Sequence, residues 1–214
     1  MQNNFTIGIL GGGQLARMSA FEAYKLGFEI AILEKKNNSP AGMMTHKEFV
    51  GWVDAKKVFN EFSASADLIT LENEFIDAHY LKELEDSGKK VFPSSRTISL
   101  IQDKLIQKKT LLKNSIPVPE FVEVKSKNDY SKIAEKLGNK FLLKSRKMGY
   151  DGYGNATVNN ESDFIKYYEK LTGRHSLLMA EKFVEFQKEL AVMVARTKKE
   201  IKIYPVVETI QKNH

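Results

Sequence analysis

The first half of the sequence alternates short apolar runs with amphipathic stretches, and this alternation constrains the fold most. Apolar runs with strand character occupy residues 5–10, 28–33, 67–71 and 90–92. Between them lie stretches with helical spacing, which begin after three glycines, near Asp54, whose side chain can cap the helix, and near Asp77. Strand, helix and strand in repeated order predict a parallel sheet with right-handed crossovers.

The pattern changes near residue 95. One or two helices are predicted over 96–114, followed by an extended Ile-Pro-Val-Pro linker at 116–119. Strands and helices then mix in an α+β order. The last three predicted strands cover 176–181, 188–196 and 200–208, with a hairpin turn between the second and the third. We therefore predict two domains, 1–95 and 96–214.

Composition and charge limit the class of protein. The chain has 214 residues, is 42% hydrophobic and holds no cysteine, which excludes disulfides, thiolate metal sites and a cysteine nucleophile. The net charge of +6 divides unevenly, since residues 1–100 hold 11 basic and 13 acidic side chains and residues 101–214 hold 22 and 14. The lysines are scattered and do not form a block, which disfavours nucleic-acid binding. A basic second half that binds a small polyphosphate fits the sequence better. With no membrane span or signal peptide in the sequence, we expect a cytoplasmic protein.

A glycine-rich turn follows the first apolar run. Gly11–Ala16 reads Gly-Gly-Gly-Gln-Leu-Ala and fits G-x-G-x-x-A, in which a tight turn and a helix start offer N–H groups to an anion. Glu34 stands where an acid would hold ribose in a dinucleotide enzyme. The turn predicts a phosphate- or ribose-bearing ligand, with a purely structural connection as the alternative.

A lysine with a second glycine-rich stretch forms a more informative motif. Lys144 lies in an apolar strand, and five residues later Gly149, Gly152 and Gly154 lead back into a strand. Backbone N–H groups of such a loop, with the lysine charge, can hold phosphates during transfer. The alternative is a flexible hairpin with a solvated basic rim.

Acidic residues at strand ends complete the candidate set. The backbone of residues 182–184, beside Glu181, could pair with an adenine edge, and Glu189 could accept hydrogen bonds from a ribose. Glu72 and Glu74 share one face of a strand end. Each pattern is also typical of solvated charges, and the four histidines show no metal-ligand spacing.

These motifs occur together in one order, at residues 11–18, 70–74, 103–108, 149–154 and 204–208. In this combination the chain resembles the 5-(carboxyamino)imidazole ribonucleotide synthases, ATP-grasp enzymes of purine biosynthesis. The most specific segments are Gly-Gly-Gln-Leu-Ala-Arg-Met and Gly-Tyr-Asp-Gly-Tyr-Gly. The resemblance covers essentially the whole chain. It implies an α/β fold, with a Rossmann-like pre-ATP-grasp domain over 1–95 and an incomplete ATP-grasp α+β domain over 96–214.

The resemblance also implies roles for the candidate residues. The ATP phosphates would contact Lys104, which is commonly arginine in the family, and Lys144. The lid loop would comprise Gly149, Tyr150, Asp151, Gly152, Tyr153, Gly154 and Asn155. The adenosine would contact Glu181, Lys182, Phe183, Val184 and, through its ribose, Glu189. The aminoimidazole ribonucleotide would lie beside Gly13, Gln14, Leu15, Glu72 and Tyr150, with Glu74 less favoured.

The implied reaction is a carboxylation driven by ATP. Bicarbonate and ATP would give carboxyphosphate, which carboxylates the amino group of 5-aminoimidazole ribonucleotide. Lysines and Mg²⁺ would neutralise charge, and a closed lid would exclude water. The resemblance also implies a homodimer.

Two departures from the family pattern stand out. Gln211 takes a position that is commonly histidine, with His214 three residues later. The family's metal ligands and ribonucleotide-phosphate residues lie beyond the position that corresponds to His214, so we expect an incomplete form with no metal ligands of its own. Val206–Ile210 is then expected to be an apolar strand without a sheet.

Three other classes of protein stay open. The chain could be a non-catalytic nucleotide-binding remnant or half of a split ligase. An NAD-dependent oxidoreductase would explain Gly11–Ala16 and Glu34, but it leaves the lysine and the second glycine-rich stretch without a role. A related purine ligase or a biotin-dependent carboxylase would share the architecture, and the two most specific segments argue against both.

Overall fold

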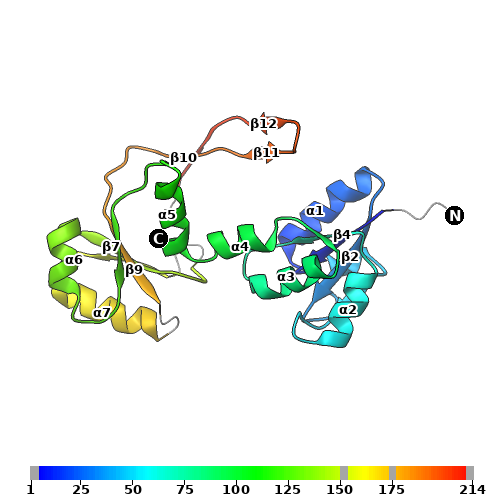
Figure 1. Ribbon diagram of the computed structural model, residues 1–214, viewed down its shortest axis with the longest axis horizontal. Coiled ribbons are helices and arrows are strands. Elements are labelled where there is room, and N and C mark those ends of the chain that lie inside the picture. The colour runs from blue at the N-terminus through cyan, green and yellow to red at the C-terminus, as the bar shows by residue number, and fades with distance from the viewer. Residues whose placement is uncertain (1–4, 150–153, 174–176, 211–214) are drawn as a thin grey trace. The chain divides into compact units, whose positions relative to one another are not determined.

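The computed structural model describes residues 5–149, 154–173 and 177–210 and forms two compact units, Met1–Asn114 and Ser115–His214 (Figure 1). The sequence pattern predicts a domain boundary between residues 95 and 96, and the units divide later. The physical reason lies in helix α4 (Ser95–Ile101), which packs against helix α3 (Ala78–Asp86) and buries Ile98 in the core of the first unit.

The first unit contains a parallel sheet of five strands in the order β3-β2-β1-β4-β5. The strands are β1 (Thr6–Leu10), β2 (Glu29–Glu34), β3 (Glu48–Val50), β4 (Leu68–Leu71) and β5 (Lys90–Val91). The remaining helices are α1 (Gln14–Lys25), the short 3₁₀ helix η1 (Gly42–Met44), α2 (Lys56–Ala64) and α5 (Lys104–Lys113). The predicted parallel sheet is confirmed, while β3 is an addition.

Helix boundaries follow local capping, with one correction. Asp77 caps α3, since its carboxylate accepts a hydrogen bond from the N–H of His79. Asp54 does not cap α2, because that helix begins two residues later behind Ala55, which makes no side-chain capping bond.

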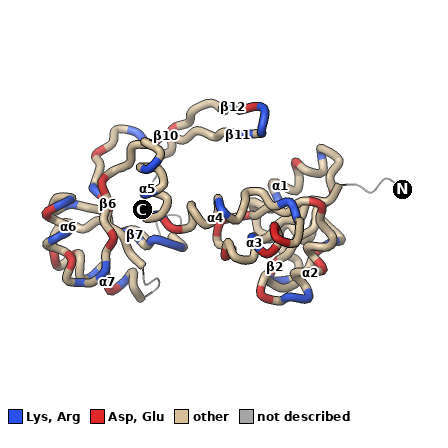
Figure 2. Tube along the Cα trace, viewed as in Figure 1, with Lys and Arg blue, Asp and Glu red and all other residues tan. Residues whose placement is uncertain are grey.

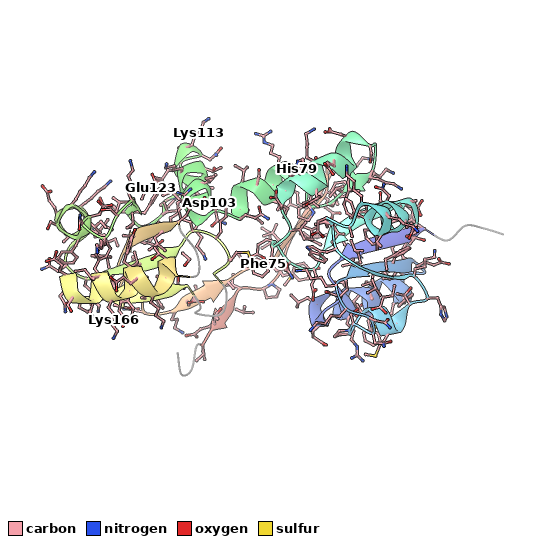
Figure 3. All side chains as sticks on the ribbon, turned by 90° about the horizontal axis from the view of Figure 1, so that it is seen from below. Phe75, His79, Asp103, Lys113, Glu123 and Lys166 are labelled. Carbon is pink, nitrogen blue, oxygen red and sulfur yellow. The ribbon has the colours of Figure 1, made fainter. Side chains whose placement is uncertain are left out.

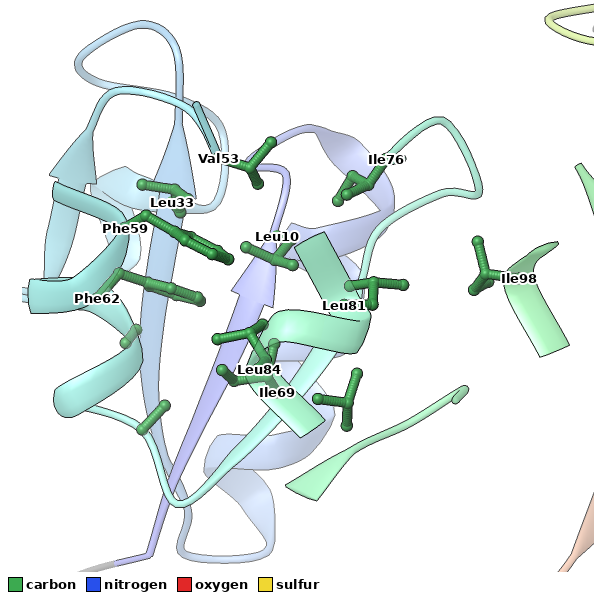
Figure 4. Close-up of a cluster of buried hydrophobic side chains, with 13 residues drawn as sticks. Leu10, Leu33, Val53, Phe59, Phe62, Ile69, Ile76, Leu81, Leu84 and Ile98 are labelled. Atoms are coloured by element: carbon green, nitrogen blue, oxygen red, sulfur yellow. The ribbon is translucent and has the colours of Figure 1, made fainter. Parts of the chain in front are cut away.

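Helices cover both faces of the parallel sheet, which explains why its central strands read as continuous apolar runs. One core holds Phe59 and Phe62 of α2 with Leu81 and Leu84 of α3 (Figure 4). A separate core lies under α1, where three small alanines, Ala16, Ala20 and Ala23, pack against β1 and β2 residues. Because both faces are covered, a ligand can reach this sheet only at the ends of its strands, where the loops begin.

The second unit is built on an antiparallel sheet of four strands in the order β6-β9-β7-β8. These strands are β6 (Phe121–Val124), β7 (Phe141–Ser145), β8 (Asn155–Val158) and β9 (Leu178–Lys182). Helices α6 (Tyr130–Leu137) and α7 (Glu161–Thr172) bury Phe141, Leu143 and Phe164 against one face. Because side chains alternate along a strand, the opposite face receives the intervening residues.

A ribbon made of two successive antiparallel strand pairs follows β9. Its four short strands are β10 (Glu189–Ala191), β11 (Val194–Arg196), β12 (Ile201–Ile203) and β13 (Val207–Thr209). β10 pairs with β13 and β11 with β12, and basic residues mark the connecting turn (Figure 2). Val206–Ile210 was expected to be an apolar strand without its sheet, and in the structure β13 pairs with β10 in a two-stranded sheet, where Val207 lies opposite Ala191. Every residue of the four strands is nevertheless exposed.

The helices in the part of the chain that the structure describes are all too short or too polar to cross a membrane.

Candidate functional site

The glycine turn of the first unit is held by two carboxylates. The N–H of Gly12 donates to Oε2 of Glu34 at 2.9 Å, and the N–H of Gly13 donates to Oε2 of Glu72 at 2.9 Å. The N–H of Gly11 donates to the Leu33 carbonyl at 3.0 Å. The N–H groups that could receive a pyrophosphate in a dinucleotide enzyme are therefore already bonded, which argues against the oxidoreductase alternative.

Other side chains approach two glycines of this turn closely. A Cβ at position 13 would lie 2.3 Å from Oε1 of Glu72, and one at position 12 would lie 2.3 Å from the Ser39 hydroxyl. Gly13 itself has an ordinary φ of −77°, so close approach and not backbone conformation requires glycine. Glu72 also places a negative charge at the start of α1, where the helix dipole favours it.

This cluster lies at the point where the strand order reverses. The turn follows β1 and Glu72 follows β4, which are neighbours on either side of the reversal. Open α/β sheets bind ligands in this position. Of the residues expected beside the ribonucleotide, the structure brings Gly13 and Glu72 into contact, with Gln14 and Leu15 exposed next to them.

Lys144 in the second unit forms an ion pair with Glu181. Its Nζ lies 3.0 Å from Oε1 of Glu181, and the two side chains are only 20% and 9% exposed. Leu142 stands opposite Glu181 and Lys144 opposite Met179, so the pair lies on the sheet face away from α6 and α7. The structure thus joins two residues that were proposed for different ends of one nucleotide.

A second cationic side chain follows on the same unit. Arg146 Nη1 lies 2.7 Å from Oε1 of Glu123, which Figure 3 labels, and the arginine side chain is 12% exposed. The buried Ser145 hydroxyl has no hydrogen-bond partner among the residues described. Gly154, with φ +88°, approaches both Ser145 and Gly149, so the ends of the glycine-rich stretch meet. Sequence reasoning missed Arg146 and Ser145, although both follow Lys144 directly.

The end of β9 is tied to its surroundings by two lysines. Lys182 donates from its backbone N–H to the Glu120 carbonyl at 2.8 Å and from Nζ to the Glu120 carboxylate at 2.9 Å. The hydrogen bond and charge of Lys182 lower the pKa of Glu120. Lys140 Nζ lies 3.7 Å from the centroid of the Phe183 ring. These contacts fix the segment expected to contact adenine.

The other predicted residues are distributed more widely. Lys104 is the first residue of α5, in the first unit, directly after Asp103, the capping residue labelled in Figure 3. Glu189 lies exposed on β10, opposite Thr209. Val184 is exposed and Asn155 begins β8. Tyr150, Asp151, Gly152 and Tyr153, together with Gln211 and His214, lie outside the described residues.

Acidic and histidine side chains do not gather into a metal site in the described ranges. No group of three or more histidine, aspartate or glutamate residues there could hold a metal ion. The carboxylates nearest the glycine turn, Glu34 and Glu72, accept hydrogen bonds from backbone N–H groups.

Comparison with known protein families divides the chain into two matches. Residues 4–102 match the ribonucleotide synthetase preATP-grasp domain, and residues 109–214 match the ATP-grasp domain. The gap between the matches, residues 103–108, comprises Asp103 and the first half of α5.

Several known proteins resemble the chain along almost all of its length. A phosphoribosylaminoimidazole carboxylase of Candida glabrata is 42% identical over 98% of this chain and 37% of the relative. A carboxyaminoimidazole ribonucleotide synthase of Aspergillus clavatus, solved with ATP, is 37% identical with a TM-score of 0.90 over 99% of this chain and 56% of that one. The enzyme of the same organism with ADP and 5-aminoimidazole ribonucleotide is 35% identical, with a TM-score of 0.88 over 100% of this chain and 55% of that one.

The chain therefore spans about half the length of these solved relatives, and less of the carboxylase. Both family matches, the order of elements and the agreement with solved structures point to one group of proteins. The chain therefore combines a ribonucleotide synthetase preATP-grasp domain with an ATP-grasp domain, and along its length it is similar to N5-carboxyaminoimidazole ribonucleotide synthases.

Proposed function

We propose that this chain binds ATP and 5-aminoimidazole ribonucleotide as part of a ligase that makes 5-(carboxyamino)imidazole ribonucleotide in purine biosynthesis. The observation that carries the proposal is the largely buried Lys144–Glu181 pair on the face of the antiparallel sheet away from α6 and α7. A partly buried cation beside a glycine-rich stretch offers charge-assisted hydrogen bonds to phosphate. A relative solved with ATP supports this assignment.

In the proposed reaction a bicarbonate oxygen attacks the γ-phosphorus of ATP and ADP leaves, which gives carboxyphosphate. The ribonucleotide amino nitrogen then attacks the carboxyl carbon, phosphate leaves and the nitrogen loses a proton. Lys144 would neutralise phosphate charge, and residues 182–184 would orient the adenine. Lys104 and Glu189 would add contacts to phosphate and ribose, and Gly149, Gly154 and Asn155 would frame the loop Tyr150–Tyr153.

The glycine turn of the first unit would hold the ribonucleotide. Glu72 accepts from Gly13 through Oε2, and its other oxygen faces the same turn. Gln14 and Leu15 would complete this side. The relative solved with 5-aminoimidazole ribonucleotide supports this substrate.

Mg²⁺ would accompany ATP and neutralise its phosphates. The described residues do not supply a three-ligand site for it, so the roles proposed for Lys144 and Glu72 stand without the metal. We further propose a cytoplasmic enzyme that acts as a homodimer.

The test is ADP release by the purified chain with ATP, Mg²⁺, bicarbonate and 5-aminoimidazole ribonucleotide. It is run alone and with a separately expressed C-terminal part of a homologous synthase. ADP release that depends on the ribonucleotide in either case supports the ligase. ATP binding without turnover in both cases supports a nucleotide-binding protein instead, and no binding of ATP contradicts the proposal.

A further inference from the structure

We infer that Lys140 is a positioning residue, which sets the nucleobase preference of the proposed ATP site by holding the ring of Phe183. This inference rests on the proposed function. Lys140 Nζ lies 3.7 Å from the Phe183 centroid, within the distance at which a cation is attracted to an aromatic face. Phe183 is the first residue after β9, where the chain leaves the sheet.

The residues around this contact fix the chain on both sides. Phe141, which follows Lys140, pairs with Lys182 across β7 and β9. On the other side of β9, Glu120 accepts both the backbone N–H and the Nζ of Lys182. Lys182 is therefore held by backbone pairing, whereas Phe183 lies beyond the last sheet pair and depends on side-chain contact for its orientation.

The position of Phe183 matters because a base edge would be read by backbone groups. An adenine edge needs a donor and an acceptor at fixed spacing, and rotation of residues 183–184 would change that spacing. The phosphates would be held elsewhere, by Lys144, whose ion pair with Glu181 does not involve Phe183. Loss of the Lys140–Phe183 contact should therefore weaken base recognition and leave phosphate binding intact.

The experiment measures the affinities of the chain for ATP, GTP and inorganic tripolyphosphate by calorimetry. Lys140→Met should weaken ATP binding about two- to five-fold, as the strength of an exposed cation–π contact implies, and reduce the preference for ATP over GTP. Tripolyphosphate affinity should not change. Lys140→Arg should restore the wild-type pattern, because arginine also binds an aromatic face.

The matched control is Lys136→Met, which removes the same charge from the last turn of α6, near Glu120. Phe183→Leu should act like Lys140→Met, and the double variant should show less than the sum of both effects if the two residues act as a pair.

Equal loss of ATP and tripolyphosphate affinity in Lys140→Met would overturn the inference, since it would indicate a general effect of charge or stability. Unchanged ATP and GTP affinities would overturn it too. Both results would leave the proposed function standing, provided that the wild-type chain binds ATP. Failure of the wild-type chain to bind ATP would overturn the proposed function and this inference together.

Discussion

The two units use the glutamates of their strands and adjoining loops in different ways. In the first unit Glu34 and Glu72 accept hydrogen bonds from backbone N–H groups of the glycine turn. In the second unit Glu181 and Glu123 pair with the cationic side chains of Lys144 and Arg146. A backbone donor cannot move away without changing the fold, whereas a lysine or arginine can exchange one anion for another. The first arrangement therefore stabilises a turn, and the second can release a cation to a phosphate.

The strongest test of this difference removes an exchangeable cation. Lys144→Met should weaken binding of tripolyphosphate and ATP by about 10- to 100-fold, because a hydrogen bond to a charged group contributes about 1.5–3 kcal/mol. Calorimetric titration measures the affinity. Lys170→Met, on the exposed last turn of α7, is the control and should bind as the wild type does. Equal affinities for the wild type and Lys144→Met would show that the pair with Glu181 is only structural.

The glycine turn should respond in stability. Gly13→Ala places a Cβ against Glu72 and should lower the free energy of unfolding by about 2 kcal/mol, as overpacking does. For a chain of this size the melting temperature should fall by about 4–8 °C. The control is Gly173→Ala, whose Cβ would lie 3.4 Å from the nearest atom, the Glu169 carbonyl oxygen. This variant should change the melting temperature little. A similar melting temperature for both variants would mean that Glu72 moves aside easily.

Salt dependence separates the two kinds of glutamate. Glu34 accepts from the N–H groups of Gly12 and Lys35, and a glutamine would turn its NH₂ group toward one of these donors. Glu34→Gln should cost about 1 kcal/mol of stability at any ionic strength. Glu123→Gln should cost about 0.5 kcal/mol, and less at high salt, because the Glu123 carboxylate is partly exposed and its pair with Arg146 is screened. Denaturant unfolding at two salt concentrations measures both values, and equal salt dependence would contradict the comparison.

The smallest effect concerns Asp129, which precedes α6. Burial raises its pKa, but hydrogen bonds from the N–H groups of Lys125 and Ser126 and the charge of Lys132 outweigh burial, so the pKa lies below 3.8. Because the pKa is lowered in the folded state, the ionised Asp129 stabilises the protein above pH 3.8. This stabilisation is lost as the pH falls through the lowered pKa.

Asp129→Asn should therefore be less stable than the wild type at neutral pH, by about 1 kcal/mol or less, and the difference should shrink in acid. Urea unfolding between pH 3 and pH 7 measures the difference. A gap that widens in acid would contradict the assigned direction.

Periodicity was sufficient to predict the parallel sheet, because strands buried on both faces read as continuous apolar runs. The carboxylates around the glycine turn were only partly predictable. Glu72 was expected beside a ligand, and its bond to Gly13 depends on how β1 and β4 pair. Glu34 was interpreted as a ribose acceptor, whereas its oxygens are bonded to the N–H groups of Gly12 and Lys35.

The second unit shows the same limit. Lys144 and Glu181 were both selected, but their ion pair joins residues 37 positions apart and follows only from the antiparallel register of β7 and β9. The contact of Lys140 with Phe183 has no local sequence signal at all, since neither residue stands in a motif with the other. The unit boundary after residue 114 depends on how Ile98 packs, which helical spacing alone does not specify.

The fully exposed ribbon β10–β13 has a consequence for cooperativity. Opening it would expose little new apolar surface, so its unfolding should depend weakly on denaturant and be independent of the sheet formed by β6–β9. Its amide hydrogens should exchange with deuterium long before those of β7 and β9, in which the paired residues Leu143 and Ala180 are completely buried. A ligand or protein segment that covered the ribbon would therefore be needed to make the ribbon unfold cooperatively with the sheet.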